Sequence, residues 1–204
     1  MKSDSIAFGI AGIFFGLIAG WVIGSQQASL RPGTAPPGAA AQTAPASSAP
    51  ATTRAATLDE QQVTALKSVA EREASNATPR IQLGNLYFDA ERYTDAIEWY
   101  ERALKLAPKN VDVSTDLGVS YYYANQPDKA LQQFAASLKL DPRHAKTLLN
   151  VGIVKAFGKQ DLEGASEAWQ QVITAAPGSP EAQAAQRALD SLRSAHSGGQ
   201  KPGA

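Results

Sequence analysis

The sequence lacks several kinds of side chain on which common functions depend. It has no cysteine and 2 histidines among 204 residues, and 19 basic side chains are balanced by 19 acidic ones. The absence of cysteine excludes a disulfide scaffold, a cysteine-ligated zinc site and a cysteine nucleophile. A formal net charge of zero provides no general attraction to DNA or RNA, so we expect no nucleic-acid partner. An apolar content of 44% fits one modest helical domain with additional segments.

Catalytic and metal-binding motifs are also missing. The sequence contains no His-Glu-x-x-His, no Gly-x-Ser-x-Gly and no calcium-loop spacing. The stretch from Gly152 to Lys159 resembles a phosphate-binding loop, but it has one residue too many between its glycines, and Gln160 follows where a hydroxyl residue is required. His144 and His196 have no partner in the sequence pattern, and we expect both to be solvated. The sequence therefore predicts a protein that is not an enzyme and needs no metal or cofactor.

An uncharged apolar segment runs from residue 6 to residue 24. This segment, IAFGIAGIFFGLIAGWVIG, has about 19 residues, which is enough for a helix to cross a hydrocarbon layer of ~30 Å. The alternatives are a buried core helix and a cleaved signal peptide. The segment is long for a signal peptide, and its only small-residue cleavage pattern, at Gly24, is weak. We predict an uncleaved transmembrane anchor over residues 1–24.

Glycines recur every four residues within this segment, at Gly12, Gly16, Gly20 and Gly24. This spacing places them along one side of a helix, where a second helix can approach closely, so the pattern favours lateral pairing. Glycine is also common in membrane helices for other reasons, which leaves a plain anchor as the alternative. The flanking basic residues favour an N-terminus in the cytoplasm. In a bacterium the rest of the chain would then lie on the extracytoplasmic, periplasmic side.

Residues 25–56 are rich in Ala, Pro, Ser and Thr and contain almost no large apolar side chains. Such a composition cannot bury enough surface to offset the entropy of ordering, so we predict a disordered linker. Its reach is at most about 100 Å as an extended polyproline II chain. We expect the linker to hold the following domain near the membrane while leaving it free to rotate.

From residue 77 onward the sequence repeats with a period of 34 residues. Leu83-Gly84-x-x-Tyr87 aligns with Leu117-Gly118-x-x-Tyr121 at this offset. The same offset pairs Ala96 with Ala130, Tyr100 with Phe134, Ala103 with Ser137 and Pro108 with Pro142. A third copy contains Gly152, Trp169 and Pro177 and needs one extra residue, which we place in the turn 159–164. The repeats cover residues 77–110, 111–144 and 145–179.

Each repeat has the pattern of two antiparallel helices. Small residues mark the points where the helices cross closely, large aromatic residues fill the space between them, and the closing proline ends the second helix. These residues resemble the signature of the tetratricopeptide repeat (TPR). The resemblance implies an all-α solenoid of three helix-turn-helix repeats whose stacking buries a continuous core and leaves a concave face. Ser137 at an alanine position and Lys155 at an aromatic position depart from the pattern.

Helices are predicted on both sides of the repeats. Thr57-Leu58-Asp59-Glu60 has the spacing of a capping box and predicts a helix over 58–75, a candidate second half of a degenerate fourth repeat. After the third repeat, an alanine-rich segment predicts a polar-faced capping helix over 180–194. The TPR domain then covers residues 57–194, and residues 195–204 are predicted to form a disordered tail.

The resemblance also indicates which side chains line the concave groove, because the first helix of each repeat supplies them. The predicted partner-binding residues are Asn85, Phe88, Asp89, Asp116, Val119, Tyr122, Tyr123, Lys146, Asn150, Ile153 and Phe157. Aromatic rings offer apolar contact and asparagines can bond a peptide backbone, which is typical of a protein-binding surface. We expect Tyr122 and Tyr123 to face the groove and Tyr121 to pack in a helix junction.

One TPR subfamily holds the C-terminal carboxylate of chaperones through basic and asparagine side chains. Only Asn85 and Lys146 match that arrangement, and Asp116 would repel a carboxylate. We therefore do not expect a receptor for chaperone tails.

The sequence as a whole predicts a non-enzymatic, membrane-tethered adaptor that binds a peptide segment of a protein partner in the groove. The layout is similar to membrane-tethered bacterial repeat proteins that scaffold envelope assembly, a comparison of architecture and not of a site. The alternative is a self-associating platform, in which the glycine seam and the ends of the repeats pair copies into a homo-oligomer. A composite enzymatic site shared with a partner has no support in the sequence.

Overall fold

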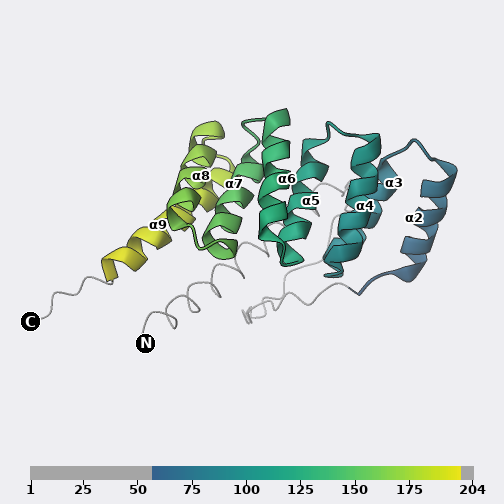
Figure 1. Ribbon diagram of the computed structural model, residues 1–204, viewed down its shortest axis with the longest axis horizontal. Helices are drawn as coiled ribbons and strands as arrows, with labels where there is room; N and C mark the ends of the chain where they lie inside the picture. Colours follow the sequence, from purple (N-terminus) through teal and green to yellow (C-terminus); the bar gives the residue numbers. More distant parts are fainter. Residues whose placement is uncertain (1–56, 199–204) are drawn as a thin grey trace, which may run out of the picture. The chain divides into compact units, whose positions relative to one another are not determined.

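The computed structural model describes residues 57–198, which form an array of helices (Figure 1). The helices are α2 (Glu60–Arg72), α3 (Thr78–Asp89), α4 (Tyr93–Leu106), α5 (Val111–Tyr123), α6 (Pro127–Leu140), α7 (Ala145–Ile153), the π-helical turn η2 (Val154–Gly158), α8 (Leu162–Ala175) and α9 (Pro180–Gly198). The described residues contain no strand, which confirms the predicted all-α fold class for this part of the chain.

The predicted membrane anchor, with Gly12, Gly16, Gly20 and Gly24, lies outside the described residues, as does the predicted linker over 25–56. Between residues 57 and 198, none of the helices combines the length and the apolar composition that crossing a bilayer requires.

Three helix pairs follow one another along the array. They are α3 with α4, α5 with α6, and α7 and η2 with α8, and they fall within the residue ranges of the three predicted repeats. The two helices of each pair are joined by the same turn, in which one residue adopts a positive φ: Glu91 at 58°, Asn125 at 59° and Gln160 at 57°. In the first two turns the next amide bonds a carbonyl five residues back, Arg92 N to Tyr87 O at 2.8 Å and Gln126 N to Tyr121 O at 2.9 Å. This bond satisfies a carbonyl at the end of the first helix.

A glycine on the first helix packs against an aromatic ring on the second helix in every repeat. A Cβ atom added at Gly84 would lie 2.5 Å from a ring carbon of Tyr100, and a Cβ at Gly118 or Gly152 would collide in the same way with Phe134 or Trp169. All three rings are buried. The structure thus confirms that the small residues allow close helix crossings and that the aromatic residues fill the core between them.

The extra residue of the third repeat is accommodated in its first helix, so its predicted place in the turn 159–164 is wrong. In η2 the amide of Lys159 bonds the carbonyl of Val154, five residues back, and the turn bond from Asp161 N spans six residues to Lys155 O at 2.8 Å. A π-helical turn absorbs one residue inside a helix in this way. The turn that follows keeps the length and the positive φ found in the other two repeats.

Ser137 departs from the repeat pattern without leaving a buried polar group unpaired. Its side chain is fully buried, and its hydroxyl oxygen lies 2.7 Å from that of Ser114. Gln133 Nε2 donates to the same Ser114 oxygen, also at 2.7 Å. Ser137 on the second helix therefore has a hydrogen-bond partner in Ser114 on the first helix of the same repeat. The alanine typical of this position would need no such partner.

The helix α2 covers the N-terminal end of the array. It starts at Glu60 and not at 58, because Asp59 is its N-cap and accepts from the amides of Gln61 and Gln62 at 3.0 and 3.1 Å. It ends at Arg72, short of the predicted residue 75. Arg80 of α3 donates to the carbonyls of Ala70 and Asn76 at 2.8 and 2.7 Å, so a guanidinium caps its C-terminal end.

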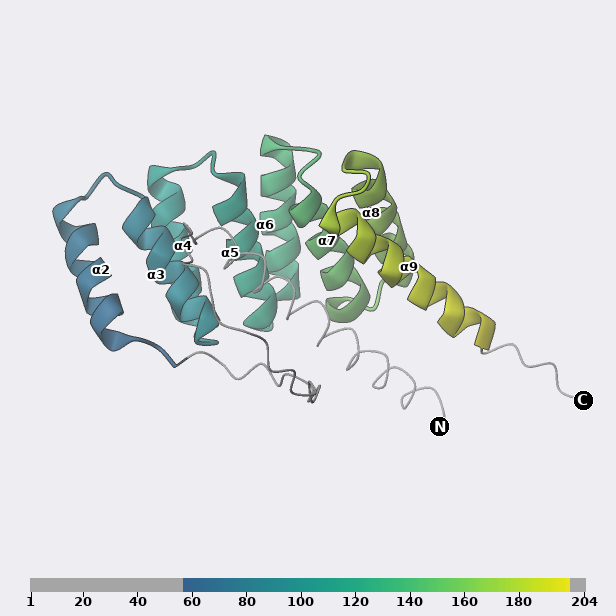
Figure 2. The same cartoon turned by 180° about the vertical axis from the view of Figure 1, so that it is seen from behind.

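The helix α9 covers the other end of the array, lying obliquely against α7 and α8 (Figure 2). Its buried face is made of small residues and one leucine: Ala182, Ala184, Ala185, Ala188 and Leu189. Exposed Gln183, Gln186, Arg187 and Asp190 form its outer face, as a capping helix requires. The helix continues to Gly198, so the predicted boundary between helix and tail at residue 194 is four residues too early.

Candidate functional site

The first helices of the three repeats, α3, α5 and α7 with η2, carry the predicted partner-binding residues, and we call the side chains at these positions the first-helix face. An ion pair joins two of these helices: Lys146 Nζ of α7 lies 2.7 Å from Asp116 Oδ1 of α5. The side chains of Lys146 and Asp116 are 24% and 17% exposed, which shields the pair from solvent more than an ordinary surface pair. Burial raises the pKa of Asp116, and the ammonium of Lys146 opposes this shift.

The two predicted asparagines are each held in one orientation by a hydrogen bond. Asn85 Oδ1 accepts from the hydroxyl of Tyr100 at 2.7 Å, so its amide NH2 is directed elsewhere. Asn150 Nδ2 donates to the carbonyl of Lys146 at 2.8 Å. Burial raises the pKa of Tyr100 well above its usual value, with smaller contributions from the charges of Asp116 and Asp89. The hydroxyl of Tyr100 therefore remains a proton donor toward Asn85.

The sequence predicted that His144 would be solvated and without a partner. The structure instead places it in a chain of polar side chains between α5 and α7. Its Nδ1 lies 2.7 Å from Thr147 Oγ1, which lies 2.7 Å from Thr115 Oγ1, and Thr115 donates to the carbonyl of Val111 at 2.8 Å. Each hydroxyl has one proton, so this chain assigns the Nδ1 proton to His144 as donor. The other ring nitrogen, Nε2, lies 3.3 Å from Asp112 Oδ1, and it donates to this carboxylate in the imidazolium form of His144, in which both nitrogens carry a proton.

That histidine sets the ionisation of Asp112. The hydrogen bond from His144 is the largest influence and lowers the pKa of this carboxyl, against a smaller rise from partial burial. The side chains of Thr115 and Thr147 are fully buried. The spatial arrangement of Asp112, His144 and Thr147 therefore offers no accessible nucleophile. The chain of hydrogen bonds ties repeat two to repeat three and gives no sign of a catalytic triad.

Aromatic rings form a cluster at the C-terminal ends of α3 and α5. Phe88 contacts Tyr93 edge-on at 5.4 Å between ring centroids and Tyr123 edge-on at 5.6 Å, and Tyr93 stacks on Tyr123 at 5.0 Å. Tyr122 meets Tyr123 edge-on at 5.6 Å. The four rings are half-buried, and burial raises the pKa of Tyr123 to about 12. The cluster offers apolar surface whose rings are already held in place by one another.

Tyr93 is a member of this cluster that the sequence did not predict. It begins the second helix α4, whereas the predicted positions all lie on first helices. The short turn after α3 brings the start of α4 beside the end of α3. This proximity could have indicated from the sequence that Tyr93 joins the rings at the end of α3. Tyr121, predicted to pack in a helix junction, is half-buried, and its hydroxyl donates to Glu101 of α4 at 2.6 Å.

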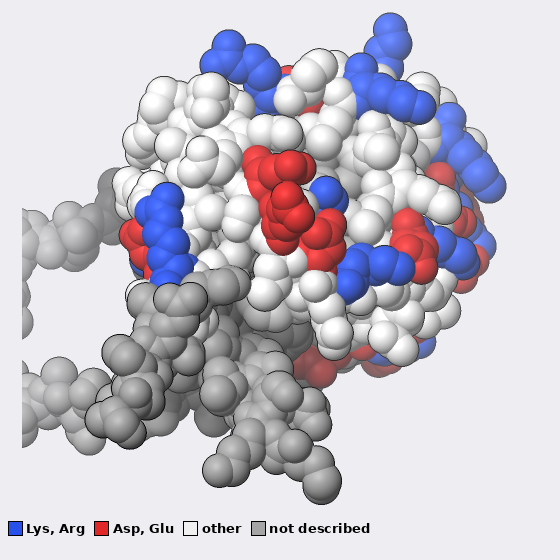
Figure 3. All heavy atoms as spheres, turned by 60° about the vertical axis from the view of Figure 1, so that its left-hand side comes forward, with Lys and Arg blue, Asp and Glu red and all other residues white. Residues whose placement is uncertain are grey.

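Two predicted residues are buried and present little surface to a partner. Val119 is 6% exposed and packs in the core with Phe134 and Val154, and Asn150 is 7% exposed. Ile153 and Phe157 are half-buried, whereas Asp89 is exposed at the end of α3. Figure 3 shows that acidic side chains gather beside a basic one on one side of the array, within a largely uncharged surface.

A cleft of about 630 Å³ lies between α2, α3 and α4, away from the predicted positions. Its lining includes Lys67, Glu71, Tyr87, Glu98, Trp99 and Arg102. Its charged and aromatic groups contact one another: Arg102 pairs with Glu98, and its guanidinium lies 4.6 Å from the Trp99 ring. Among the described residues, no group of His, Asp and Glu side chains has a composition and proximity suited to holding a metal ion.

Two family models match this array of helices. A model described as TPR repeat matches residues 84–124, and one described as Tetratricopeptide repeat matches residues 115–180. No curated protein matches the sequence. The matched segments and the helical pairs support a TPR protein, the class that the sequence predicted, and neither model describes a catalytic family.

Solved structures share the fold at low sequence identity. A structure of MamA is 21% identical with a TM-score of 0.55, covering 64% of this chain and 76% of that one. The Sgt2 TPR domain from Aspergillus fumigatus is 24% identical with a TM-score of 0.54, covering 63% and 86%. The Arabidopsis OM64 TPR domain is 16% identical with a TM-score of 0.51, covering 57% and 95%. These likenesses establish an all-α TPR-type solenoid, a fold suited to binding proteins or peptides.

Proposed function

We propose that the protein is a non-enzymatic, membrane-tethered adaptor that binds a peptide segment of a protein partner along the first-helix face. The observation that carries the proposal is the combination of a pre-packed aromatic cluster with oriented polar groups on neighbouring first helices. Phe88, Tyr93, Tyr122 and Tyr123 supply apolar contact, and the amide of Asn85 is fixed by Tyr100. Rigid rings and fixed amides lose little entropy on binding, which favours recognition of an extended segment.

The apolar segment 6–24 and the linker 25–56 support the membrane tether. An anchor followed by a long spacer restricts the repeats to the volume near the bilayer and raises their effective concentration toward partners there. We propose a periplasmic location and a role in envelope complex assembly, with the architecture of anchored bacterial repeat proteins as support.

Site-specific photo-crosslinking in native membranes tests the adaptor. A photoreactive phenylalanine analogue replaces Tyr122 of the full chain, and a matched probe replaces Gln132, which is exposed on the second helix α6. The expected result is a distinct protein cross-linked from Tyr122 but not from Gln132, with the contact mapped to one segment of that protein. Equal products from both positions would contradict a partner site on the first-helix face.

The alternative function is a self-associating platform built by the glycine seam and the repeat ends. The polar outer faces of α2 and α9 argue against end-to-end stacking, so the seam would have to carry this function. Gly16→Leu and Gly20→Leu are the discriminating variants. The platform predicts that Tyr122 probes cross-link only to further copies of the chain and that these two substitutions disperse the assembly.

A further inference from the structure

Three carboxylates and one lysine occupy the part of the first-helix face shared by α3, α5 and α7. Asp116 is paired with Lys146 at 2.7 Å, and Asp112 faces His144 at 3.3 Å. Asp89 forms no ion pair with another described residue. The face therefore keeps more negative than positive charge after Lys146 has paired with Asp116.

Asp116 and Asp89 act on a common group, the hydroxyl of Tyr100, whereas Asp112 lies in the first turn of α5 against His144. Asp116 and Asp89 both raise the pKa of the Tyr100 hydroxyl, and this hydroxyl bonds Asn85 at 2.7 Å. Burial raises the pKa of Asp116, whose side chain is 17% exposed, so this carboxylate is poorly compensated by solvent, whereas Asp89 is exposed and forms no ion pair among the described residues. A cation supplied by a ligand would restore that compensation.

Aromatic rings lie next to this negative region. Asp89 directly follows Phe88, which contacts Tyr93 edge-on at 5.4 Å. Elsewhere the chain places its own cations over rings: Arg92 lies 4.8 Å from the Tyr87 centroid, and Lys129 lies 5.6 Å from that of Tyr121. No such cation contact occurs for Phe88, Tyr93 or Tyr122 within the described part of the chain.

We infer that the first-helix face selects peptide segments that carry Lys or Arg beside apolar side chains, and that the Asp116–Lys146 pair sets this selectivity. The inference rests on the proposed function and names the chemistry of its partner. A cation of the segment pairs with Asp89 or displaces Lys146 from Asp116, while an adjacent apolar side chain packs on the rings of Phe88, Tyr93 and Tyr122. An acidic segment is disfavoured, because Lys146 would have to leave Asp116 to meet it.

A set of three peptides tests the selectivity against the full chain in a neutral detergent. The peptides have about 12 residues and capped ends, and differ only in carrying Lys, Gln or Glu at the same few positions of an apolar sequence. Fluorescence anisotropy should show the Lys peptide binding about tenfold more tightly than the Glu peptide, with the Gln peptide between them. The gap should narrow as salt is added, because the ligand charges remain partly solvated.

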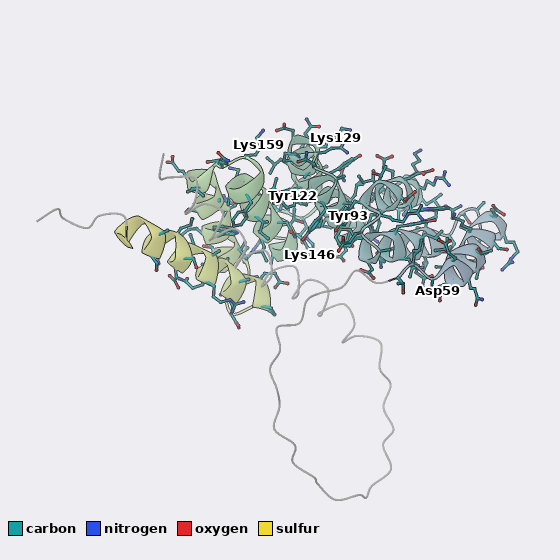
Figure 4. The ribbon with its side chains drawn as sticks, turned by 90° about the horizontal axis from the view of Figure 1, so that it is seen from below. Asp59, Tyr93, Tyr122, Lys129, Lys146 and Lys159 are labelled. Atoms are coloured by element: carbon teal, nitrogen blue, oxygen red, sulfur yellow. The ribbon has the colours of Figure 1, made fainter. Side chains whose placement is uncertain are left out.

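The inference predicts that substitutions of the two members of the ion pair change the affinity for the Lys peptide in opposite directions. Lys146→Met frees Asp116 and should strengthen binding of the Lys peptide by about threefold to tenfold, whereas Asp116→Asn should weaken it by a similar factor. Lys159 and Asp128 form the matched control, because they are also 2.7 Å apart. In Figure 4, Lys159 lies at the upper edge of the array, away from Lys146. Lys159→Met and Asp128→Asn should leave all three affinities unchanged.

The outcomes separate this inference from the function on which it rests. Equal binding of the three peptides, abolished by Tyr122→Ala, would overturn the charge selectivity and retain a peptide-binding face. Equal responses of the Lys146–Asp116 and Lys159–Asp128 variants would also overturn it, because only the overall charge of the protein would then matter. If no peptide binds, both the selectivity and the peptide-binding face are contradicted.

Discussion

A glycine opposite a ring is the residue-scale unit on which each repeat is built. Gly84, Gly118 and Gly152 leave room for rings of different size and shape: Tyr100, Phe134 and Trp169. The indole of Trp169 also donates to the carbonyl of Leu149 at 3.3 Å. The ring of the second helix fills the space opposite each glycine. A larger residue in place of the glycine would therefore force one of the two helices to move.

Gly84→Ala should destabilise the array by about 1–3 kcal/mol, because the new methyl group overlaps the Tyr100 ring. Urea unfolding of the full chain, followed by circular dichroism, measures the change. Gln82→Ala on the same helix is the control and should have little effect, because Gln82 is exposed. Tyr100→Leu makes room for the methyl group, so the double variant should lose less stability than the two single variants added together. Simple additivity would contradict the proposed contact.

Acid should weaken the link between Asp112, in the first turn of α5, and His144, the N-cap of α7. The folded pKa of Asp112 lies below the ordinary value of 3.8, so its contribution to stability is complete above that value and is lost as the pH falls through the folded pKa. Thermal unfolding at pH 5 and pH 3 should therefore show a larger difference between the wild type and Asp112→Asn at pH 5. A difference that grows toward pH 3 would contradict the assigned sign.

Residue patterns predicted the core more reliably than the candidate site. The period of 34, with one extra residue in the third repeat, identified the glycines and the rings that the structure brings together, because the close crossing of two helices requires both. Position on a first helix could not show that Val119 would be covered by Phe134 and Val154, or that Tyr93 would join the rings from the next helix. Burial and ring contacts of this kind depend on how neighbouring repeats pack, which a pattern within one repeat does not contain.

At the scale of elements, the third repeat differs from the others by the π-helical turn η2. The length of the repeat showed that one residue had been added, but an insertion in the turn and one in the helix give the same length. The structure separates them, because Gln160 keeps the positive φ of Glu91 and Asn125 while the first helix contains the extra residue. The turn also lets Phe157 follow Gly152 at a spacing one residue longer than that of Phe88 from Gly84.

Deleting Lys155 should convert this helix to regular α-helical bonding with the fold retained. The repeat returns to 34 residues, and stability should change by no more than about 1–2 kcal/mol, part of it from the lost Lys155–Asp161 pair at 3.7 Å. Deleting Ser120 from α5 is the matched comparison and should unfold the array, because it rotates the rest of a regular helix by about 100° relative to its core. Helical circular dichroism and thermal melting distinguish the two. Unfolding of both variants would show that η2 is required.

At the scale of the whole molecule, the array is a row of helices with polar surfaces at its two ends. The described residues place α2 at one end and α9 at the other (Figure 1). Each has one buried face against the repeats and an outer face of exposed polar side chains. Polar outer faces of this kind disfavour end-to-end stacking of further copies, which is consistent with the proposed use of the lateral first-helix face.

Removing residues 180–204 should make the protein associate. The loss of α9 uncovers the surfaces of α7 and α8 that its buried alanines and Leu189 cover. Light scattering after size-exclusion chromatography, in the same detergent as the full chain, should show larger species at equal protein concentration. A variant shortened only at residue 199 keeps α9 and should behave as the full chain does. Identical elution of all three chains would contradict a capping role.

The guanidinium of Arg80, bonded to a carbonyl in the last turn of α2 and to one in the loop that follows, has a mechanical consequence. Each helix of the row contacts mainly its neighbours, so a pull on the chain ahead of Thr57 is carried in series and reaches α2 first. The contacts that must break before α2 separates include its buried face, the Arg80 bond to the carbonyl of Ala70, the Glu60–Arg92 ion pair at 4.0 Å and the contact of Lys67 with the Tyr87 ring. The repeats behind it would keep their shape under the load. Under the proposed membrane tether, we expect α2 to separate first and to lengthen the chain while the first-helix face stays folded.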